Sequence, residues 1–311
     1  MIQLQNLVKD YGSLRAVDHI NFTINEGEIL GFLGPNGAGK STTLKVITCF
    51  LAPTEGNIFV EDYSVLEHSQ EIRKLIGYLP EHNPLYTDMT VYDYLAFVSR
   101  IRQIGNFKER LKEVISTCGL HGVVGKPIHT LSKGYKQRVG LAQAIIHDPK
   151  ILILDEPTSG LDPNQIAEIR QLIKHLGKEK TLIISSHILQ EVQAVCNRII
   201  IINKGRIVAD GNTEELKTSF QNKTKLNLEL LADATEVTSI IEHVKNVKLL
   251  SINQKANNVV EAVLEFQSDE DKRADIYKYI RSKNWTLLEM HRDTISLEAV
   301  FRNLTIEEGG K

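Results

Sequence analysis

The sequence contains no apolar run near the roughly 20 residues that a membrane-spanning helix needs. Its longest apolar stretches, at Ile151–Leu154 and Ile199–Ile202, have the length and β-branched residues of buried parallel strands. The first residues, MIQLQNLVKDYG, have neither the basic region nor the apolar core of a secretory signal. We therefore expect a protein that is not secreted and that works at a membrane only through a partner.

Cysteine and excess charge are also scarce. Cys49, Cys118 and Cys196 lie far apart without metal-site spacing, which predicts reduced thiols in a cytosolic protein. The formal net charge is −2, whereas non-specific nucleic-acid binding needs a concentrated basic surface. We expect no nucleic-acid partner. The chain has 311 residues, 42% of them hydrophobic, which is enough for one large globular domain and a small one.

The first two thirds of the chain alternate between strand and helix patterns. A predicted helix at Asn164–Leu176 lies between two apolar strands, and residues 71–144 are mostly helical, with a helical subdomain at about 84–147. This alternation predicts an α/β fold with a parallel sheet covered by helices. The main predicted strands are Glu28–Leu33, Ile76–Leu79, Ile151–Leu154, Thr181–Ile184 and a hairpin of Arg198–Asn203 with Arg206–Ala209.

The character of the sequence changes after about Lys217. The polar stretch Thr218–Lys225 is predicted to be a linker. Beyond it the patterns run strand, helix, strand, strand, helix, strand, followed by a last helix at Leu297–Leu304. We therefore predict a first domain over residues 1–217 and a small α+β domain of ferredoxin-like type over residues 218–311.

Residues Gly34–Ser41 (GPNGAGKS) match the phosphate-binding P-loop pattern between a predicted strand and a predicted helix. Glycines let the backbone N–H groups of such a loop point at phosphates. Lys40 is expected to contact the β- and γ-phosphates, and the Ser41 hydroxyl to ligate Mg²⁺. The other residues expected to hold the nucleotide are Gly34, Pro35, Asn36, Gly37, Ala38, Gly39 and Thr42.

Two adjacent carboxylates, Asp155 and Glu156, follow the apolar strand Ile151–Leu154. Asp155 is expected to reach the magnesium shell. Glu156, placed near a γ-phosphate, would orient and polarise the attacking water, a step worth about 10²–10⁴-fold in rate. An acidic pair at the end of a strand can instead cap the next helix, and the sequence leaves that alternative open.

Together these motifs resemble the ATP-binding-cassette (ABC) ATPases, over roughly residues 1–215 and in that family's order. The resemblance implies an ABC-type P-loop NTPase domain that binds ATP and Mg²⁺ and forms a homodimer. It also implies that Ser132 and Gly134 meet the γ-phosphate held by the second ATPase subunit. A helix capped by Ser132 would offer N–H donors to such an anion. The matching motifs are Walker A (Gly34–Thr42), Walker B (Ile151–Glu156) and the signature loop (Leu131–Tyr135).

Three further segments resemble motifs of the same family. Ser159–Asp162 is similar to the D-loop, which lies at the dimer interface. His187 matches the switch histidine that contacts the γ-phosphate, although a structural histidine is the alternative. Tyr11 stands where the family has an aromatic residue on the adenine, a contact worth about 1–3 kcal/mol. Packing of Tyr11 on the core is the alternative.

Three residues depart from the family pattern. The signature LSKGY has Lys133 and Tyr135 where the consensus LSGGQ has glycine and glutamine. Because Ser132 is retained, we expect activity to survive, with the two long side chains directed away from the nucleotide. Glu81 occupies the position of the Q-loop glutamine. Its carboxylate can still offer an oxygen to Mg²⁺ or water, so we predict a coupling and metal-binding residue, with a solvated loop acid as the alternative.

A finer resemblance is to the ATPase subunits of ABC-2 type exporters, through LSKGYKQRVGLAQAIIHDP and the segment Leu297–Thr305. GYLPEHNPLY and LDEPTSGLDPNQIAEIR resemble the gliding-motility-associated ABC ATPases of bacteria. These resemblances imply a subunit on the cytoplasmic face of the bacterial plasma membrane. It would close as a dimer over two ATP molecules and drive export through a separate ABC-2 type permease, with a link to gliding motility.

The alternative functions come from other classes of protein. A soluble non-transport ABC ATPase of regulation, translation or repair is disfavoured by the single cassette, the lack of a heptad run and the near-neutral charge. A P-loop GTPase or small-molecule kinase is disfavoured because the segment LSKGY would have no role in it. A binding module that never hydrolyses is disfavoured by Glu156 and His187. The transported substrate cannot be read from these residues, and residues 218–311 could serve dimer stability, regulation or permease contact.

Overall fold

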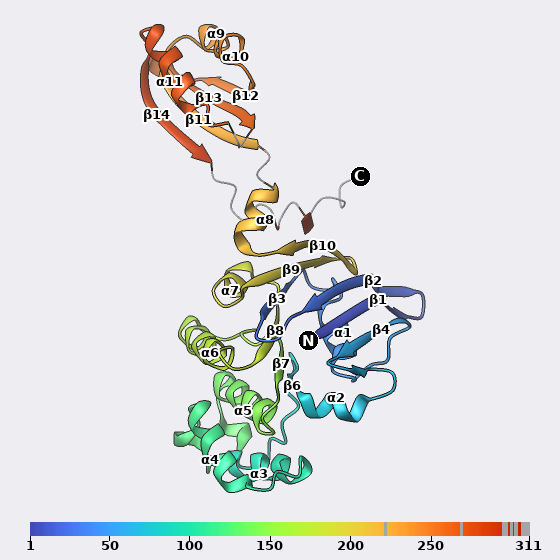
Figure 1. Ribbon diagram of the computed structural model, residues 1–311. Coiled ribbons are helices and arrows are strands. Elements are labelled where there is room, and N and C mark those ends of the chain that lie inside the picture. Colours follow the sequence, from blue (N-terminus) through green and yellow to red (C-terminus); the bar gives the residue numbers. More distant parts are fainter. Residues whose placement is uncertain (221–222, 268–269, 294–297, 299–300, 302–303, 306–311) are drawn as a thin grey trace. The chain divides into compact units, whose positions relative to one another are not determined.

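The chain forms two compact units in the computed structural model, which describes residues 1–220, 223–267, 270–293, 298, 301, 304 and 305 (Figure 1). Unit 1 comprises Met1–Thr213 and Leu304–Lys311, and unit 2 comprises Glu214–Asn303. Helix α8 (Thr213–Phe220) and strand β11 (Lys223–Leu231) both extend into the polar stretch predicted to be a linker, so that prediction is wrong for residues 218–220 and 223–225. Polar composition does not separate a helix or a strand from a loop, and two glutamates in the first turn suit the positive end of this helix.

The centre of unit 1 is a six-stranded sheet with the order β10-β9-β3-β8-β7-β6. Its strands are parallel except for β10, which pairs antiparallel with β9 through a turn at Lys204 and Gly205. Both turn residues have positive φ, +47° and +78°, as a type I′ hairpin requires. The predicted parallel sheet and hairpin are confirmed. The strands are β3 (Ile29–Leu33), β6 (Ile76–Leu79), β7 (Ile151–Asp155), β8 (Thr181–Ser186), β9 (Arg198–Asn203) and β10 (Arg206–Gly211).

A second, antiparallel sheet of unit 1 has the order β2-β1-β4-β5. Helix α1 (Lys40–Ile47) shares one hydrophobic core with this sheet and with Ile151 and Ile153 of β7. Leu152 and Leu154 belong instead to the core on the other face, because successive strand residues point to opposite sides. The strands are β1 (Ile2–Tyr11), β2 (Leu14–Ile24), β4 (Glu55–Val60) and β5 (Tyr63–Ser64).

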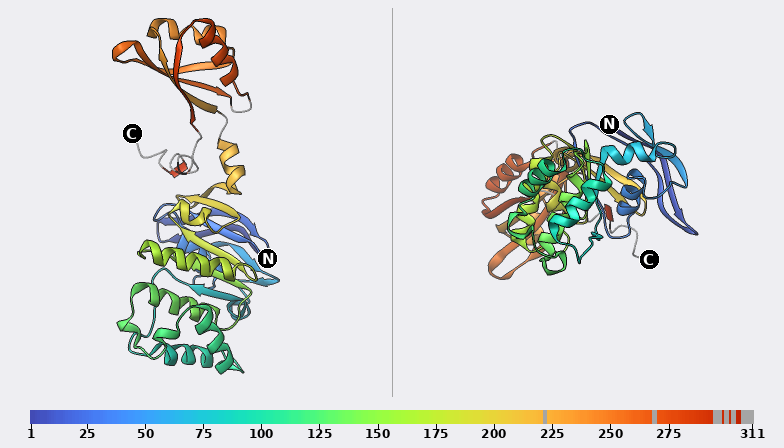
Figure 2. Two further views of the ribbon diagram at one scale, coloured as in Figure 1. Left: turned by 90° about the vertical axis from the view of Figure 1, so that its left-hand side faces the viewer. Right: turned by 90° about the horizontal axis from the view of Figure 1, so that it is seen from below.

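Helices cover the other face of the six-stranded sheet (Figure 2). Helices α3 to α6 share this core, so α1 and α5 pack on opposite faces of the sheet. Within the described part of the chain, no helix has the length and apolar character needed to cross a bilayer. The helices are α2 (Ser69–Leu75), α3 (Val91–Ile101), α4 (Phe107–Thr117), α5 (Lys133–Ile145), α6 (Pro163–Leu176) and α7 (Leu189–Gln193), with 3₁₀ turns at His121–Val123 and Ile128–Thr130.

Unit 2 is an antiparallel sheet of order β12-β13-β11-β14, with its helices packed on one face (Figure 1). Numbered within the unit, the strand order is 2-3-1-4, which together with the βαββαβ chain order makes the predicted ferredoxin-like fold. The predicted helix Leu297–Leu304 falls largely outside the described residues. The elements are β11 (Lys223–Leu231), α9 (Ala234–Val237), α10 (Ile240–His243), β12 (Val247–Gln254), a 3₁₀ turn (Ala256–Asn258), β13 (Val259–Gln267), α11 (Arg273–Ser282) and β14 (Thr286–Asp293).

Candidate functional site

The P-loop joins the end of β3 to the start of α1, as predicted. Gly39 caps α1 at φ +109°, and a Cβ there would lie 2.5 Å from the carbonyl oxygen of Ala16, so only glycine fits. A Cβ on Gly34 would lie 2.4 Å from the carbonyl oxygen of Ile202. No side chain caps α1. The first N–H groups of a helix have no intrahelical partner, and without a side-chain cap those of α1 are available to bind a phosphate.

Lys40 and Ser41 meet the two carboxylates that end β7. The Lys40 Nζ donates to the carbonyl oxygen of Gly34 at 2.8 Å and lies 3.3 Å from Glu156 Oε1. The Ser41 Oγ donates to Asp155 Oδ1 at 3.1 Å. The lysine and the glutamate side chains are each only 6% exposed. The fold thus brings these four predicted residues into one cluster, with a buried cation between the P-loop and the carboxylates.

Ser185, at the end of β8, belongs to the same cluster and was missed by the sequence reasoning. Its Oγ donates to Asp155 Oδ1 at 2.6 Å and accepts the backbone N–H of Glu156 at 2.9 Å. Glu156 needs this support because its φ of +49° is uncommon outside glycine and costs on the order of 1–3 kcal/mol. Ser185 stands in the IISSH motif, but one small polar residue at a strand end gave no separate signal.

The alternative in which the acidic pair caps the next helix is wrong. Helix α6 is capped by Asp162, whose Oδ1 accepts the N–H of Gln165 at 2.9 Å. Both residues of the pair are instead turned into the cluster around Lys40 and Ser185. Asp155 and Glu156 are therefore available for chemistry.

His187 follows β8 and contacts the predicted catalytic carboxylate. Its Nδ1 lies 2.8 Å from Glu156 Oε2, and its side chain is 41% exposed. The other carboxylate oxygen, Oε1, is buried and has no hydrogen-bond partner, although the Lys40 ammonium is nearby. Glu156 is held by a cation on one oxygen and an imidazole on the other.

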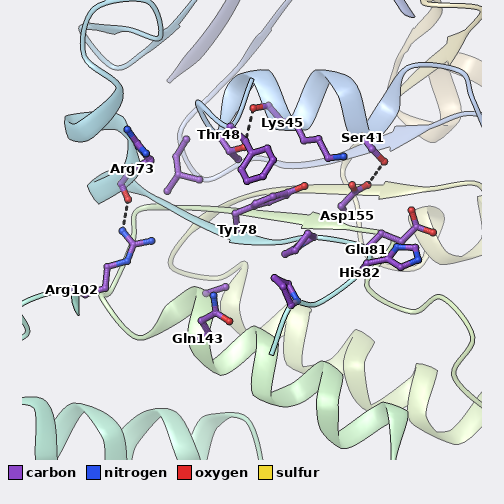
Figure 3. A pocket seen from close by; sticks show the side chains of 15 residues that line it. Ser41, Lys45, Thr48, Arg73, Tyr78, Glu81, His82, Arg102, Gln143 and Asp155 are labelled. Atoms are coloured by element: carbon purple, nitrogen blue, oxygen red, sulfur yellow. Dashed lines mark hydrogen bonds between the residues drawn. The ribbon is translucent and has the colours of Figure 1, made fainter. Parts of the chain in front are cut away.

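A cavity of about 430 Å³ adjoins the Ser41–Asp155 pair (Figure 3). Tyr78 of β6 lines it with a buried hydroxyl that has no hydrogen-bond partner. Burial raises the pKa of Tyr78, and the negative charge of Asp155 raises that pKa further, so the phenol stays protonated. The exposed residue Glu81 lines the same cavity. Its predicted metal-binding role stays a prediction.

The Ser41 hydroxyl and the Asp155 carboxylate suit Mg²⁺, which usually binds one or two carboxylates together with phosphate oxygens and water. In the described part of the chain, no three His, Cys, Asp or Glu side chains gather as a metal site. A magnesium ion here would therefore take its remaining oxygens from the nucleotide and from water. The structure fits that arrangement, since Ser41 and Asp155 already touch at the start of α1.

The predicted signature loop leads into α5, which packs on the face of the sheet opposite α1. Ser132 caps α5, as predicted, by accepting the N–H of Tyr135 at 3.4 Å. Gly134 is buried against Gln165, and the Lys133 ammonium lies over Gly160 in the predicted D-loop. The Tyr135 side chain is partly exposed.

The loop of Glu81 is attached to this helix. The Asn83 Nδ2 donates to the carbonyl oxygen of Lys136 at 3.0 Å, and its side chain lies where a Cβ on Gly140 would be. A movement of the Glu81 loop would therefore be transmitted to α5 through this hydrogen bond.

Tyr11 is the last residue of β1 and is 45% exposed, so the alternative in which it packs on the core is wrong. The Lys9 ammonium lies 5.5 Å from the centre of its ring. The exposed ring has surface left for a flat ligand. Stacking on adenine stays a prediction.

Comparison with known proteins agrees with this geometry. The family model described as "ABC transporter" matches residues 17–159. An uncharacterised ABC transporter ATP-binding protein of Bacillus subtilis is 35% identical over 303 residues, covering 97% of this chain and 98% of the relative. The bacitracin transport ATP-binding protein of Bacillus licheniformis is 37% identical over 245 residues, covering 78% and 79%. A solved dimeric ATP-binding cassette bound to ADP and Pi matches with a TM-score of 0.63 and 27% identity over 68% of this chain and 98% of its own.

Proposed function

This chain belongs to the ATP-binding proteins of ABC transporters and hydrolyses ATP, and we propose that it drives an ABC-2 type exporter as a homodimer. The observation that carries the proposal is the cluster around Glu156. Lys40 and His187 contact its two carboxylate oxygens, while the signature helix α5 packs on the opposite face of the sheet.

The cluster supports an order of events at the nucleotide. The triphosphate would lie on Gly34–Thr42, and the adenine on Tyr11. Mg²⁺, held by Ser41 and Asp155 with Glu81 nearby, would neutralise charge on the phosphates. Phosphate oxygens would also compete with Glu156 for the Lys40 ammonium, now 3.3 Å from Oε1. Glu156 would then be free to accept a proton from the attacking water while His187 keeps its other oxygen in place.

A dimer in which two copies of this chain close on each other would explain the position of the signature loop. Because α5 and α1 cover opposite faces, Ser132 and Gly134 would complete the site of the partner rather than that of their own chain. The N-terminus of α5 suits this role, since it has no acidic residue in its first turn. The related solved cassette is described as dimeric and bound to ADP and Pi.

The membrane partner would be an ABC-2 type permease, with this chain on the cytoplasmic face of the plasma membrane. The cavity beside Glu81 and the attached helix α5 offer a route by which ATP closure could move that partner. Relatives are described as bacitracin and lantibiotic transport ATP-binding proteins, which supports export and favours a peptide antibiotic as one candidate cargo.

The link to gliding motility rests on the resemblance of GYLPEHNPLY and LDEPTSGLDPNQIAEIR alone. Deleting the gene in a gliding host separates the two processes. Loss of spreading on agar with unchanged resistance to peptide antibiotics would support motility, and the reverse result would support antibiotic export.

Glu156→Gln tests the shared-site mechanism. The variant should bind ATP, lose about 10²–10⁴-fold in turnover and accumulate as a dimer on a sizing column, because the amide cannot take a proton from water. Glu168→Gln is the matched control, because the exposed Glu168 carboxylate forms its ion pair with Arg138 and not with Lys40 or His187. Fast turnover by Glu156→Gln, or an ATP-loaded monomer, would contradict the proposal.

A further inference from the structure

We infer that Glu191 is a positioning residue that holds the Glu156 and His187 loops together from behind the reacting atoms. This inference rests on the roles proposed above for those two residues. Glu191 lies on α7, is 9% exposed, and touches neither Glu156 nor His187 in any contact that the described residues show. Its carboxylate reaches residues beside them instead.

The carboxylate joins two loops at one oxygen. Glu191 Oε2 accepts a hydrogen bond from the Thr158 hydroxyl and another from Ser186 Oγ, the latter at 3.1 Å. Thr158 comes two residues after Glu156, and Ser186 directly before His187. Both hydroxyl residues are buried, at 5% and 1% exposure. A change at Glu191 therefore acts on both loops at once.

Helix α7 gives this carboxylate a rigid base. Val192, the next residue, packs so closely on β3 that a Cβ on Gly31 would lie 2.0 Å from its Cγ1. Only glycine at position 31 allows this approach. Since β3 continues into the P-loop, the same strand that places Lys40 also supports Glu191.

The expected consequence falls on turnover rather than on ATP affinity. Hydrogen bonds to a carboxylate are stronger than neutral ones, and without Glu191 the buried hydroxyls of Thr158 and Ser186 would each lose the acceptor to which they donate, although the Ser186 oxygen would still accept the N–H of Ile188 at 3.0 Å. The two loops would then shift relative to each other. Glu156 Oε2 and His187 Nδ1, now 2.8 Å apart, would lose their alignment. A displacement of about 1 Å in a catalytic group can cost on the order of 10²-fold.

Steady-state ATPase kinetics of the full chain test the inference. Glu191→Ala should lower kcat by roughly 10- to 100-fold and leave the KM for ATP within about 2-fold. Glu191→Gln should recover most of the lost turnover, because its amide oxygen still accepts both hydroxyls. Val114→Ala, which removes buried methyl groups from α4 in the same unit, serves as the control for lost stability. It should lower Tm while kcat stays near the parent value.

Thr158→Val supplies an independent arm. It removes one of the two hydroxyl donors, so it should lower kcat by itself, and its effect should not add to that of Glu191→Ala. Unchanged kcat in Glu191→Ala, strict additivity, or an equal loss in Val114→Ala at matched Tm would overturn the inference. If Glu191→Ala does not fold, the other two variants decide. A normal kcat in Glu191→Gln together with a lowered kcat in Thr158→Val would still support the inference. A normal kcat in Thr158→Val would refute it. Failure of the proposed function would appear separately, as fast turnover by Glu156→Gln.

Discussion

Replacing Ser185 by alanine removes one oxygen that serves both carboxylate residues at the end of β7. The Ser185 hydroxyl donates to Asp155 Oδ1 at 2.6 Å and accepts the N–H of Glu156 at 2.9 Å. The residue is fully buried. The void left by a single oxygen is too small for a water molecule to take over both bonds. The substitution should therefore affect both stability and turnover.

The magnitude follows from the two lost bonds. A hydrogen bond to a charged group contributes about 1.5–3 kcal/mol, and a buried N–H without an acceptor costs about 1–3 kcal/mol. The two hydrogen bonds share the Ser185 oxygen, and the backbone can relax when they are lost. We therefore expect a combined loss of about 2–4 kcal/mol in the free energy of unfolding, less than the sum of the two values. For a unit of this size that corresponds to a drop in Tm of roughly 5–10 °C. Without its acceptor, the left-handed backbone of Glu156 should relax, and kcat should fall as well.

Ser99→Ala is the matched control for Ser185→Ala. Ser99 is equally buried, but its Oγ donates to the carbonyl oxygen of Leu95 within α3, so its removal leaves no donor unpaired. It should cost at most about 1 kcal/mol. Urea unfolding and ATPase assays of both variants give the comparison. A Ser185→Ala protein as stable and as active as Ser99→Ala would refute the role given to Ser185.

Two further predictions concern the P-loop and the helical layer. Lys40→Ala should weaken ATP binding by about 10- to 150-fold, the worth of a charged hydrogen bond, and an unchanged Kd in a fluorescent-nucleotide titration would contradict the phosphate contact. His147 has its Nε2 3.1 Å from the carbonyl oxygen of Ile76, and its Nδ1 is buried without a partner, so burial lowers its pKa to about 4. Because the unfolded histidine binds a proton near pH 6.5, stability should fall as pH drops from about 6.5 towards 4, by about 1–2 kcal/mol at pH 5. Urea unfolding at pH 7 and pH 5 should show this difference in the parent and lose it in His147→Gln; an equal fall in the variant would assign it to other groups.

Contiguous features were the ones that sequence reasoning could predict. The P-loop, the strand that precedes it and the cap at Ser132 each depend on neighbours within a few residues. The linker prediction failed at residues 218–220 and 223–225 because a polar composition suits a helix or a strand as well as a loop. The roles of Ser185 and Glu191 were missed for a different reason. Their partners lie about 30 residues away, at Asp155, Glu156 and Thr158, and a serine or a glutamate at such a distance has no local signature.

The sequence by itself determined the chemistry of this protein: a P-loop, two carboxylates, a histidine and a capped signature helix. Only the tertiary structure decided which of these meet. Lys40, Glu156 and His187 follow three strands, β3, β7 and β8, that are far apart in the chain. They meet because β8 pairs with both of the other strands in parallel, which brings all three carboxyl ends to one edge of the sheet. Strand order results from long-range pairing, which no local pattern of residues encodes. The same packing puts α5 on the face of the sheet opposite α1.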